Sequence, residues 1–355
     1  MFLSLREIRT AGGRFLLIGS VTMFITLLIV MLTGLTQGLA SRNTSALDSL
    51  KADAIVFSDP FTATPEVSFS NSVANLGVEK QLENSDHVKS VLPLGVGQTR
   101  LESDNGAEPV AVMGLPDGTA AAGTTISDAA AVPREVADKL GLHEGDTIAL
   151  AGQQVKVGAI VENEYYSHSP AVWVDTATWQ AVNHTQDAGT VLVAYGDASK
   201  DQWQQLASDT HTAITDTTGS YKGLAAYNSE RSSLTSMQGF LYGISALVTI
   251  SFLTVWTLQR TRDIAVLRAL GASPRYVLVD ALTQAAIVLA AGTGLGALVG
   301  LGLGALVQGS VPFLLSWSTV LVPAAGVFGL GIVGALIAVR QTTKVEPMAA
   351  LGAAV

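Results

Sequence analysis

The sequence predicts a membrane protein with four transmembrane α-helices and an α+β extracellular domain inserted between helices 1 and 2. The composition is typical of a membrane protein, because 48% of the 355 residues are hydrophobic and only 14% are charged. Four long apolar stretches occur, one near the N-terminus and three in the last third of the chain. Acidic residues are concentrated between the first and the second stretch, which indicates a polar domain at that place.

The first apolar stretch, residues 15–35, contains no charged residue. It is long enough to cross the ~30 Å hydrocarbon core of a bilayer, which takes ~20 helical residues. A cleaved signal peptide is the alternative, since Gly38-Leu39-Ala40 resembles a cleavage site. The stretch is longer than the ~7–15 apolar residues of a signal peptide, which favours a retained span.

The other predicted spans contain residues 240–258, 281–303 and 321–339. In and just after the second of these, glycine recurs at every fourth position, at Gly292, Gly296, Gly300 and Gly304. Small residues on one helix face allow close helix packing. A contact within one subunit is favoured here over a contact between two subunits.

The distribution of charge predicts which side of the membrane each segment faces. Residues 42–231 contain 25 acidic and 11 basic residues, whereas the rest of the chain contains 4 acidic and 9 basic residues. Arginines are concentrated in residues 1–14 and 259–275, and Lys and Arg are retained on the cytoplasmic side. We therefore expect a multi-pass protein of the plasma membrane with both termini in the cytoplasm. The net charge of −9 argues against nucleic acid as a partner.

The region between the first two spans has short β-rich segments separated by Gly, Pro, Asn and Asp, and two helical segments at residues 133–140 and 200–210. These features predict an α+β fold. The chain has no cysteine, which excludes disulfides and thiolate metal sites.

Together these features predict nine segments. They are a cytoplasmic amphipathic helix (1–14), the first span and its external extension (15–58), the extracytoplasmic α+β domain (59–229), the second span (230–258), a cytoplasmic coupling helix (259–276), the third span (277–307), a short outer turn (308–320), the fourth span (321–339) and a cytoplasmic tail (340–355).

No catalytic or metal-binding motif is present. GxxxxGK[ST], HExxH, GxSxG and CxxC are all absent, and no two histidines are four residues apart. The apolar stretches of the predicted spans contain no acidic or basic residue, and the only acidic residue directly beside one is Asp280, at the cytoplasmic end of the third, whereas ion-driven transporters carry several along their path. The sequence therefore predicts neither a catalytic residue, nor an intrinsic cofactor, nor a transporter that powers itself.

The cytoplasmic loop between spans two and three contains the string RTRDIAVLRALGASPR. Its apolar residues recur at helical spacing, which predicts a short basic helix that contacts either a cytoplasmic partner or the inner leaflet. This string resembles the coupling segment of the MacB/FtsX/LolE-type ABC transporter permeases, with Asp263 where Glu is more usual. The tail RQTTKVEPMAAL and the external string LGLHEGDTIALAGQQVKVGAIVE also resemble elements of this family, with Met348 where Ala is frequent.

The resemblance covers the whole chain and implies a function. It implies a homodimer in membrane lipid that works with two copies of a separate ATPase subunit, on which ATP and magnesium bind. The residues that would couple to the ATPase are Arg262, Asp263, Ile264, Leu267, Arg268 and Leu270. The chain itself would not be an enzyme.

In size and layout the chain is most similar to the haem-efflux (HrtB-type) members of this family, which implies haem as the substrate. Ferric haem takes an axial ligand such as Tyr, and its propionates take a cation. The candidate haem-binding residues at the outer membrane surface are Arg42, Tyr165, Tyr166, His168, Tyr227, Glu230 and Arg231. Each also has an ordinary interpretation, as an interfacial aromatic, a snorkelling arginine or a solvated helix surface.

Two other functions stay open. The first is the export of another amphiphile, such as a peptide, a drug or a lipid. The second is a scaffold of the cell-division type, which signals across the membrane and transports nothing.

Overall fold

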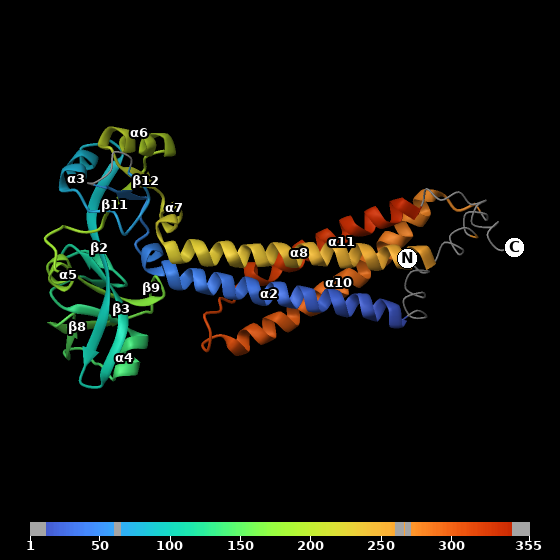
Figure 1. Ribbon diagram of the computed structural model, residues 1–355, viewed down its shortest axis with the longest axis horizontal. Helices are drawn as coiled ribbons and strands as arrows, with labels where there is room; N and C mark the ends of the chain where they lie inside the picture. The colour runs from blue at the N-terminus through green and yellow to red at the C-terminus, as the bar shows by residue number, and fades with distance from the viewer. Residues whose placement is uncertain (1–11, 60–64, 260–265, 267–270, 343–355) are drawn as a thin grey trace. The chain divides into compact units, whose positions relative to one another are not determined.

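The computed structural model describes residues 12–59, 65–259, 266 and 271–342 (Figure 1). The chain divides into two compact units. The helical unit comprises residues 1–38 and 232–355, and the outer domain comprises residues 39–231. Two long helices, α2 (Gly12–Ser49) and α8 (Ala225–Gln259), have residues in both units.

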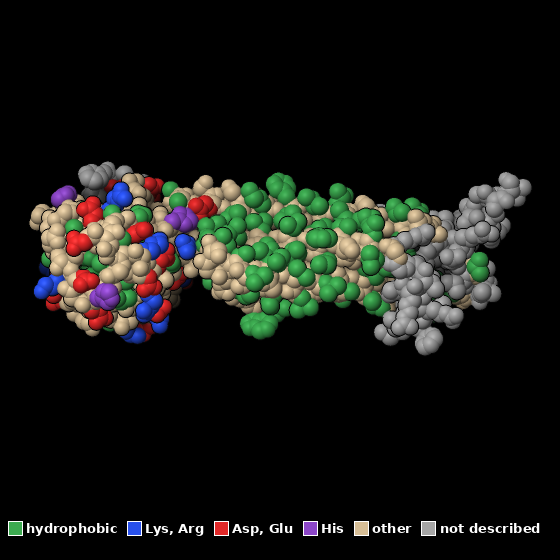
Figure 2. Space-filling view, turned by 90° about the horizontal axis from the view of Figure 1, so that it is seen from below, with side chains coloured by type: hydrophobic (Ala, Val, Ile, Leu, Met, Phe, Trp, Pro, Cys, Tyr) green, Lys and Arg blue, Asp and Glu red, His purple; other side chains and the backbone are tan. Residues whose placement is uncertain are grey.

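The described part of the chain contains four helices that are long and apolar enough to cross a membrane. They are α2, α8, α10 (Pro274–Val307) and α11 (Trp317–Thr342). On the face seen in Figure 2, hydrophobic side chains are spread along the whole length of these helices, as lipid contact requires. The α/β domain lies in sequence between the first and second of them, which confirms the predicted fold class.

Glycines allow α10 to lie close against α2. A Cβ atom at Gly292 would lie 2.8 Å from the carbonyl oxygen of Gly19, and one at Gly296 would lie 2.5 Å from that of Met23. Gly300 faces the side chain of Val30 in the same way. The four-residue spacing of these glycines therefore gives a packing face between two helices of one chain.

The turn between α10 and α11 packs against the other end of this face. Phe313 lies against Gly34 of α2 and Gly304 of α10, and the backbone N–H of Leu314 donates a hydrogen bond of 3.0 Å to the carbonyl oxygen of Gly34. Pro312 contacts Gly38 in the same manner. The short turn is thus held by α2.

The outer domain is built on one ten-stranded sheet in the order β12-β1-β11-β2-β3-β10-β6-β8-β7, with β9 paired to β10. The strands are β1 (Ala54–Phe57), β2 (Val88–Ser103), β3 (Gly106–Leu115), β6 (Ala130–Pro133), β7 (Thr147–Leu150), β8 (Gln153–Val161), β9 (Tyr165–Tyr166), β10 (Ser169–Asp175), β11 (Val191–Gly196) and β12 (Ala213–Thr215). A separate hairpin joins β4 (Ala120–Ala121) and β5 (Thr124–Thr125).

Strand β2 is long and pairs with different strands along its length. Its first half pairs with β11 and its second half with β3, while Leu101 and Glu102 also pair with β7. The pairings β2-β3-β10-β6-β8-β7-β2 therefore close a six-stranded barrel, which leaves no free edge in that part.

Short helices cover these sheets. They are α3 (Leu76–Glu83), α4 (Arg134–Leu140), α5 (Thr176–Asn183), α6 (Lys200–Thr210), α7 (Thr217–Ser220) and the 3₁₀ turn η1 (Tyr221–Gly223). Trp179 of α5 fits over Gly95 and Gly114, which face each other on β2 and β3. Two paired glycines make room there for an indole ring.

Candidate functional site

Three elements of the outer domain bring most of the candidate residues together. These elements are the last turns of α2, the first turns of α8 and the hairpin formed by β9 and β10. The hairpin is fastened to α2 by backbone hydrogen bonds, because the N–H of Ser167 donates to the carbonyl oxygen of Asn43 (3.1 Å) and that of His168 donates to Arg42 (2.9 Å). Figure 1 shows β9 beside these helix ends.

The turn of this hairpin has an unusual sequence. Tyr166 pairs with Ser169, so Ser167 and His168 alone form the loop, and both have positive φ (49° and 67°). Two-residue loops of this kind favour Asn and Gly, because other side chains are disfavoured in the left-handed region. The conformation is thus maintained by the contacts that its residues make.

Glu230 receives a hydrogen bond on each carboxylate oxygen. Its Oε1 lies 2.8 Å from Nε2 of His168, and its Oε2 accepts a hydrogen bond of 3.2 Å from Nδ2 of Asn43. A carboxylate only accepts, so Nε2 of His168 carries a proton in this arrangement. Asn43 is fully buried, and its Nδ2 also donates to the carbonyl oxygen of Leu39. One carboxylate is therefore held by donors from α2 and from the hairpin.

Arg42 and Tyr165 form a second contact between α2 and the hairpin. The guanidinium carbon of Arg42 lies 4.9 Å from the centre of the Tyr165 ring, a cation–π distance. The Tyr165 hydroxyl donates a hydrogen bond to Glu135 of α4. Burial, together with this bond to a carboxylate, raises the pKa of Tyr165 to about 12. The bond from Tyr165 in turn lowers the pKa of Glu135.

Tyr227 and Arg231 lie one turn apart on α8. The Arg231 guanidinium donates to the Tyr227 hydroxyl and lies 5.5 Å from the centre of its ring. Tyr227 is buried and packs edge-on against Tyr221, whose hydroxyl donates to Asp48. Arg231 is exposed and follows Glu230 directly in the sequence, so the first turns of α8 carry both a carboxylate and a guanidinium.

Tyr166 lies apart from the other candidates. Its side chain is buried in the core of the outer domain, where its ring packs edge-on against Phe69. Burial raises the pKa of its hydroxyl. A ligand outside the domain does not reach this hydroxyl in the conformation described, and a role for Tyr166 in binding stays a prediction.

Sequence reasoning missed Asn43 and Glu135. Asn43 stands in the helical extension of α2 between apolar residues at i−4 and i+4, Leu39 and Leu47, and a polar residue on an apolar helix face signals a buried partner. Glu135 gave no such signal, because a glutamate in the first turn of a helix is ordinary. Its contact with Tyr165 joins residues 30 positions apart.

The predicted coupling residues Arg262, Asp263, Ile264, Leu267, Arg268 and Leu270 lie outside the described residues. So does most of the predicted cytoplasmic helix of residues 1–14. Their role in coupling stays a prediction.

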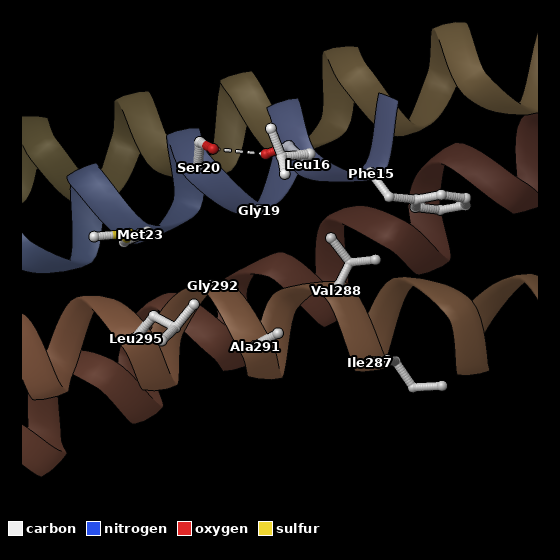
Figure 3. Close-up of a pocket in the computed structure, with 10 residues that line it drawn as sticks. All are labelled: Phe15, Leu16, Gly19, Ser20, Met23, Ile287, Val288, Ala291, Gly292 and Leu295. Atoms are coloured by element: carbon white, nitrogen blue, oxygen red, sulfur yellow. Dashed lines mark hydrogen bonds between the residues drawn. The ribbon is translucent and has the colours of Figure 1, made fainter. Parts of the chain in front are cut away.

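The helical unit contains an apolar pocket of about 350 Å³ between α2 and α10 (Figure 3). None of the residues that line it is ionisable, and the Ser20 hydroxyl is occupied by a hydrogen bond to the carbonyl oxygen of Leu16 (2.7 Å). Such a lining offers only dispersion contacts, which suit a hydrocarbon group. The lining residues are Phe15, Leu16, Gly19, Ser20, Met23, Ile287, Val288, Ala291, Gly292 and Leu295.

Comparison with known proteins shows what the chain resembles. Residues 236–347 match the family described as FtsX-like permease C-terminal. A putative hemin transport system permease protein HrtB of Staphylococcus haemolyticus is 25% identical over 99% of both chains, and one of Staphylococcus epidermidis is 23% identical over the same share. An uncharacterised ABC transporter permease of Mycobacterium bovis is also 23% identical over 99% of both chains.

Solved structures resemble the outer domain. The extracellular domain of the ABC-type transporter YknZ from Gram-positive bacteria matches 46% of this chain and 98% of its own, with 15% identity and a TM-score of 0.34. The periplasmic region of MacB from Actinobacillus actinomycetemcomitans matches 48% and 91%, with 12% identity and a TM-score of 0.35.

Proposed function

We propose that this chain, which belongs to the FtsX-like permease family, exports haem from the membrane as the permease subunit of an ABC transporter. Permeases of this MacB/FtsX type carry no catalytic ATPase activity, so the energy comes from an ATPase partner. The observation that supports haem best is similarity over 99% of the chain to relatives named as putative hemin permeases.

The chemistry of the outer domain suits this substrate. Haem presents a ferric iron and two propionates, so its recognition takes an anionic or neutral ligand together with cations. Glu230 supplies a partly exposed carboxylate, and Arg231, the next residue on α8, is exposed and supplies a guanidinium. Arg42, on the neighbouring part of α2, is partly exposed. A metal ligand and two cations thus lie on the helix segments that meet the hairpin.

The proposed transporter contains two copies of this chain and two ATPase subunits. Closure of the ATPase dimer on ATP would push the coupling helix and displace the spans. Haem would enter from the membrane and leave on the outer side. Each chain has one Glu230 and one Arg231, so a dimer would supply two such carboxylates and two such guanidinium groups to one haem.

Hemin titration of the purified full-length chain tests the substrate. Hemin is added to the protein in detergent micelles, and the Soret band is recorded. We expect a shifted band for the parent protein and a loss of at least about tenfold in affinity for Glu230→Ala, because an axial ligand is removed. Glu162→Ala is the matched control, since the Glu162 side chain is 90% exposed and belongs to the same domain.

Two outcomes would contradict the proposal. One is a parent protein whose Soret band is the same as that of hemin in empty micelles, which would favour another amphiphile as the substrate. The other is equal affinity in the Glu230→Ala and Glu162→Ala variants, which would place haem elsewhere.

A further inference from the structure

We propose that Asn43, His168 and Glu230 form a clasp that fastens the β9–β10 hairpin to helices α2 and α8, and that this clasp opens when Glu230 binds substrate. The second half of this statement rests on the proposed function, because it takes Glu230 as a substrate ligand. The first half depends only on contacts within the outer domain.

The first argument is that the contacts join three separate elements. Asn43 belongs to α2, His168 to the hairpin turn and Glu230 to α8, and the Glu230 carboxylate accepts hydrogen bonds of 2.8 Å from His168 and 3.2 Å from Asn43. Both α2 and α8 continue without a break into membrane spans. The barrel strand β10 begins at the residue after His168. The clasp therefore lies where the barrel meets both of the helices that leave it.

The second argument is the strained turn. His168 has φ of 67° at the second loop position, where glycine is most favoured in two-residue hairpins. A residue that is costly for the backbone is retained where its side chain has a role. Among the described residues, the His168 side chain donates a hydrogen bond to one side chain only, that of Glu230.

The third argument is that the two uses of Glu230 compete for space. Both carboxylate oxygens already accept a hydrogen bond, one from the hairpin and one from α2. Each oxygen keeps a second lone pair for a metal, but the haem plane around the iron needs the space beside Oε1 that the imidazole occupies at 2.8 Å. Since the Glu230 and His168 side chains are 38% and 35% exposed, the donor that faces solvent is the imidazole, whereas Asn43 is fully buried. Substrate binding would therefore release the hairpin from α8 and leave Asn43 in place.

The clasp makes His168 a positioning residue, not a ligand of the substrate. Removal of its imidazole should free Glu230 and should not weaken substrate binding. A ligand role would give the opposite result, which makes the two roles distinguishable.

Hydrogen exchange of the hairpin tests the clasp without any ligand. The full-length protein in lipid nanodiscs is compared with His168→Asn, in which the residue tolerates positive φ but is too short to reach Glu230. We expect the amides of residues 167 and 168 to exchange about fivefold faster in this variant, because a charge-assisted hydrogen bond is lost. His143→Asn is the matched control, since the His143 side chain is 84% exposed and lies in a different turn. Unchanged exchange in His168→Asn would overturn the clasp.

Addition of hemin tests the opening. In the parent protein, we expect bound hemin to raise the exchange rates of the amides of residues 167 and 168. In His168→Asn, we expect hemin to have no further effect on these rates. We also expect hemin to bind this variant at least as tightly as it binds the parent. Loss of hemin binding in His168→Asn, or bound hemin with unchanged exchange, would overturn the opening. If hemin does not bind the parent protein, the proposed substrate and the opening step both fall, and the ligand-free comparison alone decides whether the clasp exists.

Discussion

Gly38 of α2 and Pro312 of the α10–α11 turn are in backbone contact, so close that a Cβ at Gly38 would lie 2.0 Å from the Pro312 carbonyl oxygen. One turn earlier, Gly34 accepts a hydrogen bond from the N–H of Leu314 and lies against the ring of Phe313. The two glycines form a notch on α2 that receives the turn. Backbone atoms cannot move aside as a flexible side chain can, so this contact requires glycine.

The first prediction concerns this notch. Gly38→Ala should destabilise the helical unit by about 1–3 kcal/mol, as other overpacking substitutions do. Thermal unfolding in detergent, followed by circular dichroism, measures the effect. Gly302→Ala on α10 is the control, because a Cβ atom at Gly302 would meet no neighbouring atom within 4 Å. Equal stability of the two variants would show that the turn does not pack on α2.

The second prediction concerns the glycine pair beneath Trp179. A Cβ at Gly95 would lie 2.2 Å from Cδ2 of Trp179, so Gly95→Ala should destabilise the outer domain by about 1–3 kcal/mol. Trp179→Ala should cost about 3–5 kcal/mol, because a buried indole is lost. In the double variant the alanine at 95 should cost much less than it does alone, since the indole ring that it would clash with is gone. Additive losses of unfolding free energy would contradict this packing.

The third prediction concerns the pH dependence of stability through Tyr165. The pKa of Tyr165 is raised to about 12 in the folded protein. The stability that follows from this shift is fully present below the ordinary pKa of 10 and is lost as pH rises from 10 through 12. The pKa of Glu135 is lowered in the folded protein. The stability that follows from this shift is present above the ordinary pKa of 4.5 and is lost as pH falls from 4.5 through the lowered pKa. Tyr165→Phe should therefore be less stable than the parent at neutral pH.

This difference in unfolding temperature should shrink towards both extremes of pH, because protonation of Glu135 weakens the Tyr165–Glu135 hydrogen bond in the parent and ionisation of Tyr165 removes its donor. Tyr165→Phe and the parent are compared across the pH range, so that other titrating groups cancel. Tyr195→Phe is a control variant, since its hydroxyl donates to the backbone carbonyl of Leu50 and not to a carboxylate. A difference that does not vary at acid pH would mean that Glu135 takes no part.

The fourth prediction concerns coupling to the ATPase. Leu267→Ala or Arg268→Ala should abolish substrate stimulation of ATP hydrolysis in the complex and should stop efflux, while the subunit stays folded. Val266→Ala is the matched control in the same segment, because the Val266 side chain is 51% exposed. Transport that survives the changes at Leu267 and Arg268 would contradict a coupling role for this segment.

The sequence predicts the helical unit well, because each span is recognisable from residues that are close together in the sequence. A stretch such as residues 15–35 is recognisable by length and hydrophobicity alone, and the glycine spacing of α10 predicts one tight helix face, which packs on α2. The structure extends α2 to Ser49, since the periodic apolar residues after the span pack on the outer domain and not on lipid.

The outer domain is predicted only in class. Helices at residues 133–140 and 200–210 correspond to α4 and α6, but α3 and α5 are short and gave no clear pattern. Closure of the barrel depends on β2 meeting β7 some 50 residues later, and no local pattern encodes such a pairing. Residues 118–132 are mostly small and predict no particular secondary structure, yet they contain the small hairpin β4–β5.

The candidate site was also predicted only in part. Residue types identified Arg42 and Glu230 at the ends of spans and Tyr165 and His168 in the domain between them, and the structure brings these residues together. The sequence did not separate Tyr166 from its neighbour, because adjacent residues of a strand point to opposite faces and only the fold decides which face is the core. Asn43 is 187 residues from Glu230, to which it donates, so only the folded chain places them together.

The most direct test of a haem exporter driven by a partner is transport in proteoliposomes. The chain is reconstituted alone, and also together with the ATPase subunit that copurifies with it from native membranes, and the transfer of hemin out of the vesicle membrane to an external haem-binding protein is followed by absorbance. We predict ATP-dependent transfer only when both subunits are present, with loss of transfer in Glu230→Ala. Transfer by the chain alone, or ATP hydrolysis by the complex without any movement of hemin, would contradict the account.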